Sequence, residues 1–173
     1  MSPPEPEFSR MVQVSRLRAA GETIDIAASP AERAGVAVRL GLAAVDALTA
    51  SVRLTPIGAG VVTAEGTIRA RLTQTCVVSL DPFEQDLEAP LRLVFRPGSA
   101  ADRAADQTVD PEAEDETPYE GGRFDLGEAV VETLALALDP WPRRPGALLE
   151  VPPPEAGPDG PFAGLARRSR GLT

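Results

Sequence analysis

Three carboxylates at helical spacing are the residues of this sequence best suited to chemistry. Glu128, Glu132 and Asp139 fall on one narrow stripe when a helix is projected from Asp125 at about 100° per residue. Carboxylates grouped in this way serve in acid–base catalysis or bind a hard divalent cation. Catalysis needs burial or a close charge to shift a carboxylate pKa, and this stripe lies opposite the apolar arc of the helix. The spacing therefore favours a solvated face, and a stripe that faces a partner is the second interpretation.

The segment after this helix carries a second group of candidate binding residues. Trp141 stands between two prolines and is followed by the adjacent arginines Arg143 and Arg144. A tryptophan and two guanidinium groups on a stiff backbone can stack on bases and grip phosphate. The alternative is that Trp141 plugs the edge of the core while both arginines cover apolar surface or pair with an acidic loop. Both interpretations remain open at the level of sequence.

Several kinds of catalytic centre lack their usual residues. The chain has no histidine and one cysteine, Cys76, so it offers no imidazole base, no internal disulfide and too few soft ligands for a metal ion. The glycines around Ala59 join two strands and open no helix, so no phosphate-binding loop is predicted. We therefore expect no cofactor, and we interpret Cys76 as a small buried hydrophobe in a strand.

The elements that must position these residues follow from hydrophobic periodicity and helix-capping patterns. A Ser-Pro-Ala-Glu sequence from Ser29 predicts a capping box, and Asp125 with Glu128 predicts another. Alternating apolar residues predict a hairpin around Asp81-Pro82, and Pro90 indicates an edge position or a bulge in its second strand. Leu126, Val130, Leu134, Ala137 and Leu138 form the apolar arc of the second helix. In chain order we expect strands near 10–14 and 22–26, a helix from 30 to 40 or 42, strands over 48–55, 67–78 and 83–95, and a helix from 125 that Pro140 ends.

These elements predict an α+β fold with an antiparallel, curved or barrel-like sheet of about five strands, two main helices and a long acidic loop. Residues 1–150 are predicted to form a single domain, with the acidic loop at about 98–122. Residues 151–173 read as a proline-rich linker and a short basic tail, which either docks on RNA or a partner or is a disordered end. No signal peptide and no apolar run of about 18 residues are present, so we expect a cytoplasmic protein with no membrane contact.

The charge distribution bears on the partner. The net charge is −9, and all 17 basic residues are arginines. Nine acidic residues against two arginines lie between Asp102 and Asp125, so most of the negative charge is concentrated there. Such a segment can mimic phosphate toward a basic protein. Four hairpin arginines either bind RNA or pair across the strands with acids of the same face (Arg69, Arg71, Arg92 and Arg96; Glu84, Asp86 and Glu88).

Two segments together resemble the YceD family, the large ribosomal RNA subunit accumulation proteins of bacteria and plastids. They are Thr75-Cys-Val-Val-Ser-Leu-Asp-Pro-Phe83 and the stretch from Phe124 to Gly146, and the resemblance covers roughly residues 8–148. It implies a role in making the large ribosomal subunit. Many relatives carry a Cys-x-x-Cys pair where this chain has Cys76 and Ser79, so a role of that pair in metal or redox chemistry lacks its second thiol here.

The resulting hypothesis is a non-catalytic ribosome-biogenesis factor that supports accumulation or maturation of large-subunit ribosomal RNA. It would bind precursor RNA, a ribosomal protein or a processing factor, and its oligomeric state stays open. The candidate contact residues are Asp125, Glu128, Glu132, Asp139, Trp141, Arg143 and Arg144. The alternatives are a small carboxylate-dependent enzyme with a divalent cation, and a dimeric adaptor between proteins with no RNA role.

Overall fold

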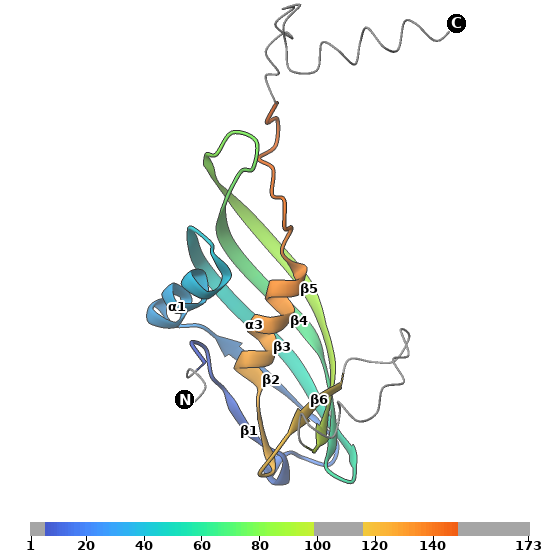
Figure 1. Cartoon of the computed structure of the whole chain (residues 1–173). Coiled ribbons are helices and arrows are strands. Elements are labelled where there is room, and N and C mark those ends of the chain that lie inside the picture. The colour runs from blue at the N-terminus through green and yellow to red at the C-terminus, as the bar shows by residue number, and fades with distance from the viewer. Residues whose placement is uncertain (1–5, 99–115, 149–173) are drawn as a thin grey trace, which may run out of the picture.

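The computed structural model describes residues 6–98 and 116–148 (Figure 1). Three strands of 15 or 16 residues dominate it. One described helix follows the first strand of the main sheet, and the other follows the last described strand of the chain. In order, the elements are β1 (Met11–Gln13), the 3-10 turn η1 (Val14–Arg16), β2 (Glu22–Ala27), α1 (Pro30–Leu40), β3 (Ala44–Gly58), β4 (Val61–Thr75), β5 (Pro82–Pro97), β6 (Glu116–Tyr119), β7 (Arg123–Asp125) and α3 (Leu126–Ala137).

The main sheet has the order β2-β3-β4-β5-β6, and all its neighbours are antiparallel except β5 and β6. The predicted α+β class and the sheet of about five strands are confirmed. The barrel-like alternative is wrong, because the sheet is open and β2 does not pair with β6. The strand β6 is too short to close it, since it pairs only with Val94–Pro97 at the end of β5. Pro90 lies on the edge strand upstream of this pairing, as predicted.

One face of the sheet carries the core. Both helices and the β1–β7 ribbon contribute buried side chains to a single cluster with the inward residues of β3, β4 and β5. Examples are Val36 from α1, Leu134 from α3 and Leu72 from β4, each fully buried. Burial of one such side chain contributes about 1.5–3 kcal/mol. Phe95 and Phe124 stack with ring centroids 3.8 Å apart and join the sheet to the ribbon. The opposite face of the sheet is polar.

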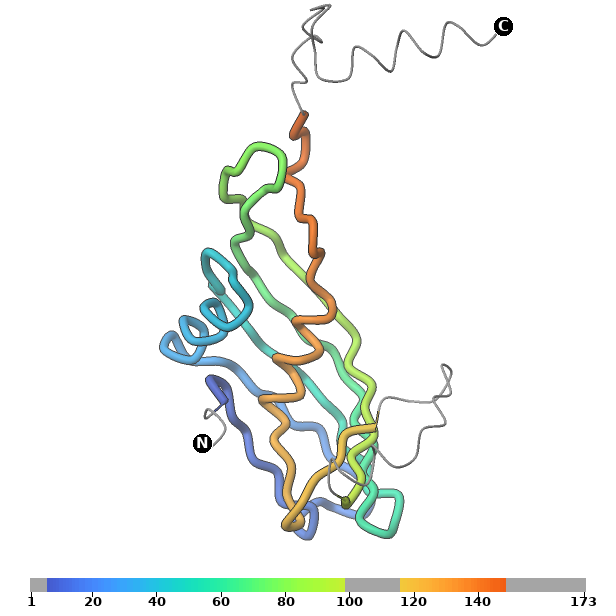
Figure 2. The backbone as a smooth tube through the Cα atoms, viewed as in Figure 1, coloured from blue at the N-terminus to red at the C-terminus, as the bar shows by residue number. Residues whose placement is uncertain are grey.

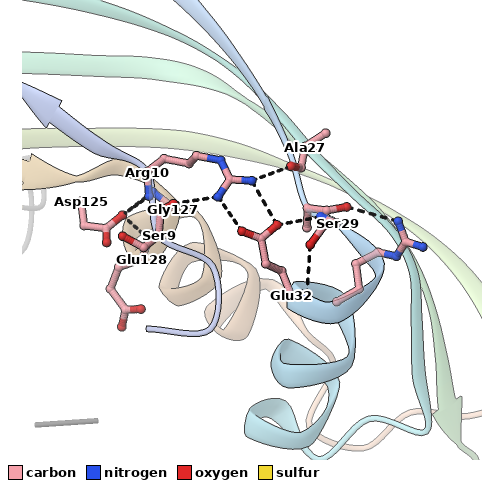
Figure 3. A network of polar contacts seen from close by, with 10 residues as sticks. Ser9, Arg10, Ala27, Ser29, Glu32, Asp125, Gly127 and Glu128 are labelled. Carbon is pink, nitrogen blue, oxygen red and sulfur yellow. Dashed lines mark hydrogen bonds and ion pairs between the residues drawn. The ribbon is translucent and has the colours of Figure 1, made fainter. Parts of the chain in front are cut away.

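The start of α1 has the predicted capping box. The Ser29 hydroxyl accepts a hydrogen bond from the Glu32 amide at 3.3 Å, and the Glu32 carboxylate accepts one from the Ser29 amide at 2.7 Å (Figure 3). Gly41 ends the helix in the left-handed conformation, with φ of 65°. The observed end at Leu40 agrees with the shorter of the two predicted ends.

The start of α3 has only half of its predicted capping box. The Asp125 carboxylate accepts hydrogen bonds from the amides of Gly127 and Glu128, and also from the Arg10 amide at 2.7 Å (Figure 3). The return bond from Glu128 is absent, because Arg39 of α1 holds both carboxylate oxygens of Glu128 at 2.6 and 2.7 Å. A contact between distant segments has therefore replaced a local one.

The apolar arc predicted for α3 is confirmed over its first turns and fails at its end. Leu126, Val130 and Leu134 are fully buried, whereas Ala137 is exposed and Leu138 is half-buried. The helix ends at Ala137, three residues before Pro140, since the ring of a proline disfavours helical backbone in the residue before it. The chain then leaves the core and runs on toward the β4–β5 turn (Figure 2).

The end of the predicted acidic loop is corrected by the structure. Within the predicted range 98–122, residues Glu116–Tyr119 form the strand β6. The Tyr119 ring is buried near Phe124, and its hydroxyl donates a hydrogen bond to the Gly60 carbonyl, which fixes this strand in place. Residues 99–115 and the linker and tail at 151–173 lie outside the described residues. The domain boundaries stay predictions.

The Arg10–Glu32 ion pair predicts an acid-sensitive contribution to stability. Hydrogen bonds from Arg10, at 2.6 and 3.0 Å, and then from the Ser29 amide lower the pKa of Glu32 to about 2 from 4.5. A depressed carboxyl pKa stabilises the folded state above about pH 4.5, and this stabilisation is lost as the pH falls toward about 2. We expect the stability difference between wild type and Glu32→Gln, measured by denaturant unfolding, to shrink over that range. Parallel curves for the two proteins would contradict the assignment.

Candidate binding site at the distal tip

Two segments that are far apart in the sequence meet at one end of the molecule. They are the turn at residues 76–81, between β4 and β5, and the extended segment at residues 139–147, after α3. The Val77 amide donates a hydrogen bond to the Pro142 carbonyl at 2.9 Å, and the Gln74 side chain contacts the Asp139 carbonyl at 3.5 Å. Figure 2 shows the chain after α3 reaching the loop that joins β4 to β5. We call residues 76–81 and 139–147 together the distal tip.

The turn of the distal tip is closed by its own backbone. The Cys76 amide donates to the Asp81 carbonyl and the Leu80 amide donates to the Cys76 carbonyl, both at 2.9 Å. Leu80 has a φ of 61°, in the left-handed region, and 75% of its surface is exposed. Left-handed backbone costs a residue other than glycine roughly 1–2 kcal/mol. The turn therefore holds an aliphatic side chain in solvent at a conformational cost.

Trp141 is 71% exposed, so the interpretation that it plugs the edge of the core is wrong. Its amide donates to the Asp139 carboxylate at 2.9 Å, which fixes the chain direction just before the indole. The segment contacts the turn through a backbone hydrogen bond between Val77 and Pro142, which leaves the indole exposed. The indole is consequently available to a partner.

The two adjacent arginines differ in their surroundings. Arg144 lies 3.7 Å from the Asp81 carboxylate, and both side chains are about half exposed, so the ion pair contributes little to stability. Arg143 is exposed and makes no ion pair within residues 6–98 and 116–148. The distal tip thus presents one uncompensated guanidinium group beside Trp141.

Cys76 is fully buried, as predicted, but it lies in the turn after β4 and not in a strand. The Ser79 amide lies 3.5 Å from its sulfur. Hydrogen bonds from the Ser79 side chain, and then from the backbone amides of Ser79 and Arg144, lower the pKa of the Cys76 thiol to about 6 from 9.0. In the described part of the chain no three or more Cys, Asp or Glu side chains are grouped in a way that would hold a metal ion. The lowered pKa therefore reflects hydrogen bonding within the tip.

We expect the single thiol of the folded protein to titrate near pH 6. The thiolate is detected by its ultraviolet absorbance, and the signal is unambiguous because Cys76 is the only cysteine. Replacing the hydroxyl with hydrogen in Ser79→Ala removes the largest stabilising hydrogen bond and should move the pKa upward. A native thiol that titrates at the same pH as in the denatured chain would contradict the described turn geometry.

The three carboxylates of the predicted stripe do not form one site. Glu128 is bound by Arg39, Asp139 accepts the Trp141 amide, and Glu132 is exposed on the side of α3. Asp125 caps the helix. The structure therefore assigns Asp125 and Glu128 to holding α3 in place, brings Asp139, Trp141, Arg143 and Arg144 together at the distal tip, and leaves Glu132 as a solvated side chain.

The hairpin arginines are mostly engaged by acids. Ion pairs at 2.9 Å join Arg69 to Glu88 and Arg71 to Asp86, and the pairs are directly opposite in the β4–β5 register. Arg96 pairs with Glu116 of β6 at 2.6 Å. The cross-strand interpretation is confirmed for the first two arginines, and three of the four are not available to RNA without losing a partner.

Two residues of the distal tip escaped the sequence analysis. Both are exposed apolar side chains: Val77 falls inside the strand predicted over 67–78, and Leu80 falls between that strand and the predicted turn. The Asp81-Pro82 dipeptide predicts the turn, but the turn begins at Cys76, before the predicted end of the strand at 78. Gln74 of β4 is buried, and its side-chain oxygen Oε1 has no hydrogen-bond partner in the described structure.

Comparison with known proteins identifies one family. The model of the family described as large ribosomal RNA subunit accumulation protein YceD matches residues 64–162, which is more than half of the chain. The described part of this match holds most of β4, all of β5, α3 and the distal tip, whereas β1, β2, α1 and β3 precede it. No curated protein and no solved structure matches the chain significantly. Among the described helices, none is long and apolar enough to cross a membrane.

Proposed function

Because this chain belongs to the YceD family, we propose that it supports the accumulation or maturation of large-subunit (23S) ribosomal RNA in bacteria as a non-catalytic binding factor. Its binding target is precursor RNA, a ribosomal protein or a processing factor. The family's description supports the ribosomal role, and the residues described here support the binding mode. In this proposal the protein works in the cytoplasm, without a cofactor.

The structure of the distal tip is the observation that supports the proposed binding mode. Both sequence segments that resemble the family meet there, through the Val77–Pro142 hydrogen bond. The tip exposes Trp141 and Leu80 and presents Arg143 without a described acidic partner. Tryptophan and arginine are enriched among the residues that dominate binding energy at interfaces. A fixed backbone also lowers the entropy cost of presenting them.

The charge distribution supports a protein partner at least as well as it supports naked RNA. The net charge of −9 opposes attraction to a phosphate backbone, and Arg69, Arg71 and Arg96 are neutralised by neighbouring acids. Direct RNA contact at the distal tip would depend on stacking by Trp141 and on few cations. We therefore expect any RNA affinity of the isolated protein to fall only weakly as salt concentration rises.

The proposal is tested by depleting the protein in its native host and measuring the ratio of 23S to 16S ribosomal RNA. We expect the ratio to fall and precursor large-subunit RNA to change in amount. An unchanged ratio after verified depletion would remove the support for the ribosomal role. Re-expression of the wild-type chain is the control, since it must restore the ratio.

The two alternative functions predict different observations. A carboxylate-dependent enzyme requires a bound divalent cation, but Glu128 is occupied by Arg39 and Asp139 by the Trp141 amide. Calorimetric titration with magnesium, calcium and manganese is expected to give no heat of binding. A dimeric adaptor with no RNA role would co-purify after crosslinking with proteins unrelated to the large subunit.

A further inference from the structure

A groove on the side of the molecule has the features of a peptide-binding surface. It has a volume of about 640 Å³ and runs between α3 and the edge strand β5. Small or apolar side chains from both elements form part of its lining, and Glu116 and Thr117 of β6 line one part of it. Leu136 of α3 also lines the groove, with 85% of its surface exposed. The lining includes Ala89 and Leu93 of β5 and Ala129, Thr133, Leu136 and Ala137 of α3.

The strand that borders the groove has an open edge. Of the 16 residues of β5, only Val94–Pro97 pair with β6, and no other described strand lies beside the upstream part. Backbone N–H and C=O groups on such an edge can hydrogen-bond an added strand. Pro90 provides no N–H, so it removes one donor. The pairing of β6 shows that the same edge accepts a parallel strand immediately next to the groove.

The charges along this edge indicate the charge of a partner that would bind there. Glu84, Asp86 and Glu88 are exposed at alternate positions of β5, and Glu132 lines the groove from α3. Asp86 and Glu88 are paired with arginines of β4, whereas Glu84 and Glu132 make no ion pair with any residue that the structure describes. Glu116 of β6 also lines the groove but is paired with Arg96, and Arg92 is the one cation among the lining residues. Among the described residues of this edge and groove, the acids without an ion pair, Glu84 and Glu132, therefore outnumber this cation.

We propose that the open edge of β5 and the groove beside α3 bind an extended segment of a basic protein partner by strand addition. Alternate side chains of that segment enter the groove next to Leu136, and the others face the acids of β5. A nucleic acid cannot reproduce the backbone pairing of a strand. A second copy of this chain, pairing edge to edge, would bring the same acidic side chains against one another. The surface is separate from the distal tip and does not depend on the proposed ribosomal role.

The test uses the full chain and a fluorescein-labelled peptide of roughly eight residues that alternates lysine and valine. Fluorescence anisotropy is expected to show saturable binding, whereas a peptide alternating glutamate and valine does not bind. N-methylation of the peptide amides on one edge removes the donors of strand pairing but keeps the charge, and should weaken binding by at least about tenfold. Binding of the N-methylated peptide with unchanged affinity would overturn strand addition.

Matched variants locate the site. Leu136→Asp should weaken binding of the lysine–valine peptide by about tenfold or more, whereas Val38→Asp on α1, which alters a side chain of nearly equal exposure (84% against 85%), should not change it. Both sites are exposed, so both variants are expected to fold, and circular dichroism checks this. The proposal is overturned if no lysine–valine peptide binds below about 1 mM, if both variants behave alike, or if sedimentation shows a dimer that Leu136→Asp dissociates.

Discussion

A Trp141→Ala/Arg143→Glu double variant is expected to fold normally and to fail in restoring the ratio of 23S to 16S ribosomal RNA in depleted cells. Both side chains are exposed and neither supports the core, so the free energy of unfolding should stay within about 0.5 kcal/mol of wild type. Loss of a tryptophan or arginine anchor typically costs 2 kcal/mol or more of binding free energy, which corresponds to about a 30-fold weaker complex. Quantification of ribosomal RNA after replacement of the wild-type gene measures the effect.

The control for this experiment changes side chains of similar kind away from the distal tip. Val38→Ala/Arg16→Glu replaces one exposed apolar residue and one exposed arginine, and the net charge changes by the same amount. It is expected to restore the ratio fully. Full restoration by the Trp141→Ala/Arg143→Glu variant would exclude these two side chains from the binding surface, and failure of both variants would show that the effect is one of charge.

Gly127→Ala is expected to destabilise the folded protein although it adds only one methyl group. A Cβ atom at Gly127 would lie 2.3 Å from the Phe8 carbonyl oxygen and 2.9 Å from the Arg10 amide nitrogen, and both are backbone atoms. The N-terminal segment would have to move away from the first turn of α3, which would disturb the Arg10–Asp125 hydrogen bond. Such overpacking costs about 1–3 kcal/mol. Thermal or denaturant unfolding of the purified variant measures it.

Gly35→Ala is the matched control because Gly35 is also a helical glycine. Its Cβ would lie 2.9 Å from both Cβ and Cγ of Glu7, and the nearest backbone atom is the Glu7 Cα at 4.0 Å. The gain in helix propensity, about 1 kcal/mol, offsets part of this contact, so we expect a smaller loss of stability than at Gly127. A Gly127→Ala protein as stable as wild type would contradict the close packing of the N-terminal segment on α3.

Local sequence patterns predicted most of the elements, since their causes are local. Ser29, Pro30 and Glu32 specify the start of α1, and alternation of apolar residues specifies the β4–β5 hairpin. The hairpin register then places Arg69 opposite Glu88. Contacts between distant segments were not predictable in this way. Arg39 binds Glu128, which is 89 positions away in the sequence. The strand β6 is held in place by the hydrogen bond from Tyr119 to the Gly60 carbonyl and by the contact of Tyr119 with the Phe124 ring.

The candidate site was predicted in part. Trp141 and Arg143 were identified because prolines on either side indicate a stiff, extended segment. Their placement beside the turn at 76–81 depends on the combined lengths of β4, β5 and α3. A local sequence pattern does not specify these three lengths together. The exposure of Trp141 was likewise undecided, because an indole next to an apolar helix fits a core edge as well as a surface. The structure decides between them, because 71% of the Trp141 surface is exposed.

Photocrosslinking from position 141 in living cells tests most directly whether the distal tip binds a component of the large subunit. A benzophenone amino acid, which keeps an aromatic group at this position, replaces Trp141, and a second strain carries it at Val38, which is also exposed. Both RNA and protein are recovered from the crosslinked products. We expect position 141, and not position 38, to capture large-subunit precursor RNA or a protein that sediments with it. Equal capture from both positions, or products unrelated to the large subunit, would contradict it.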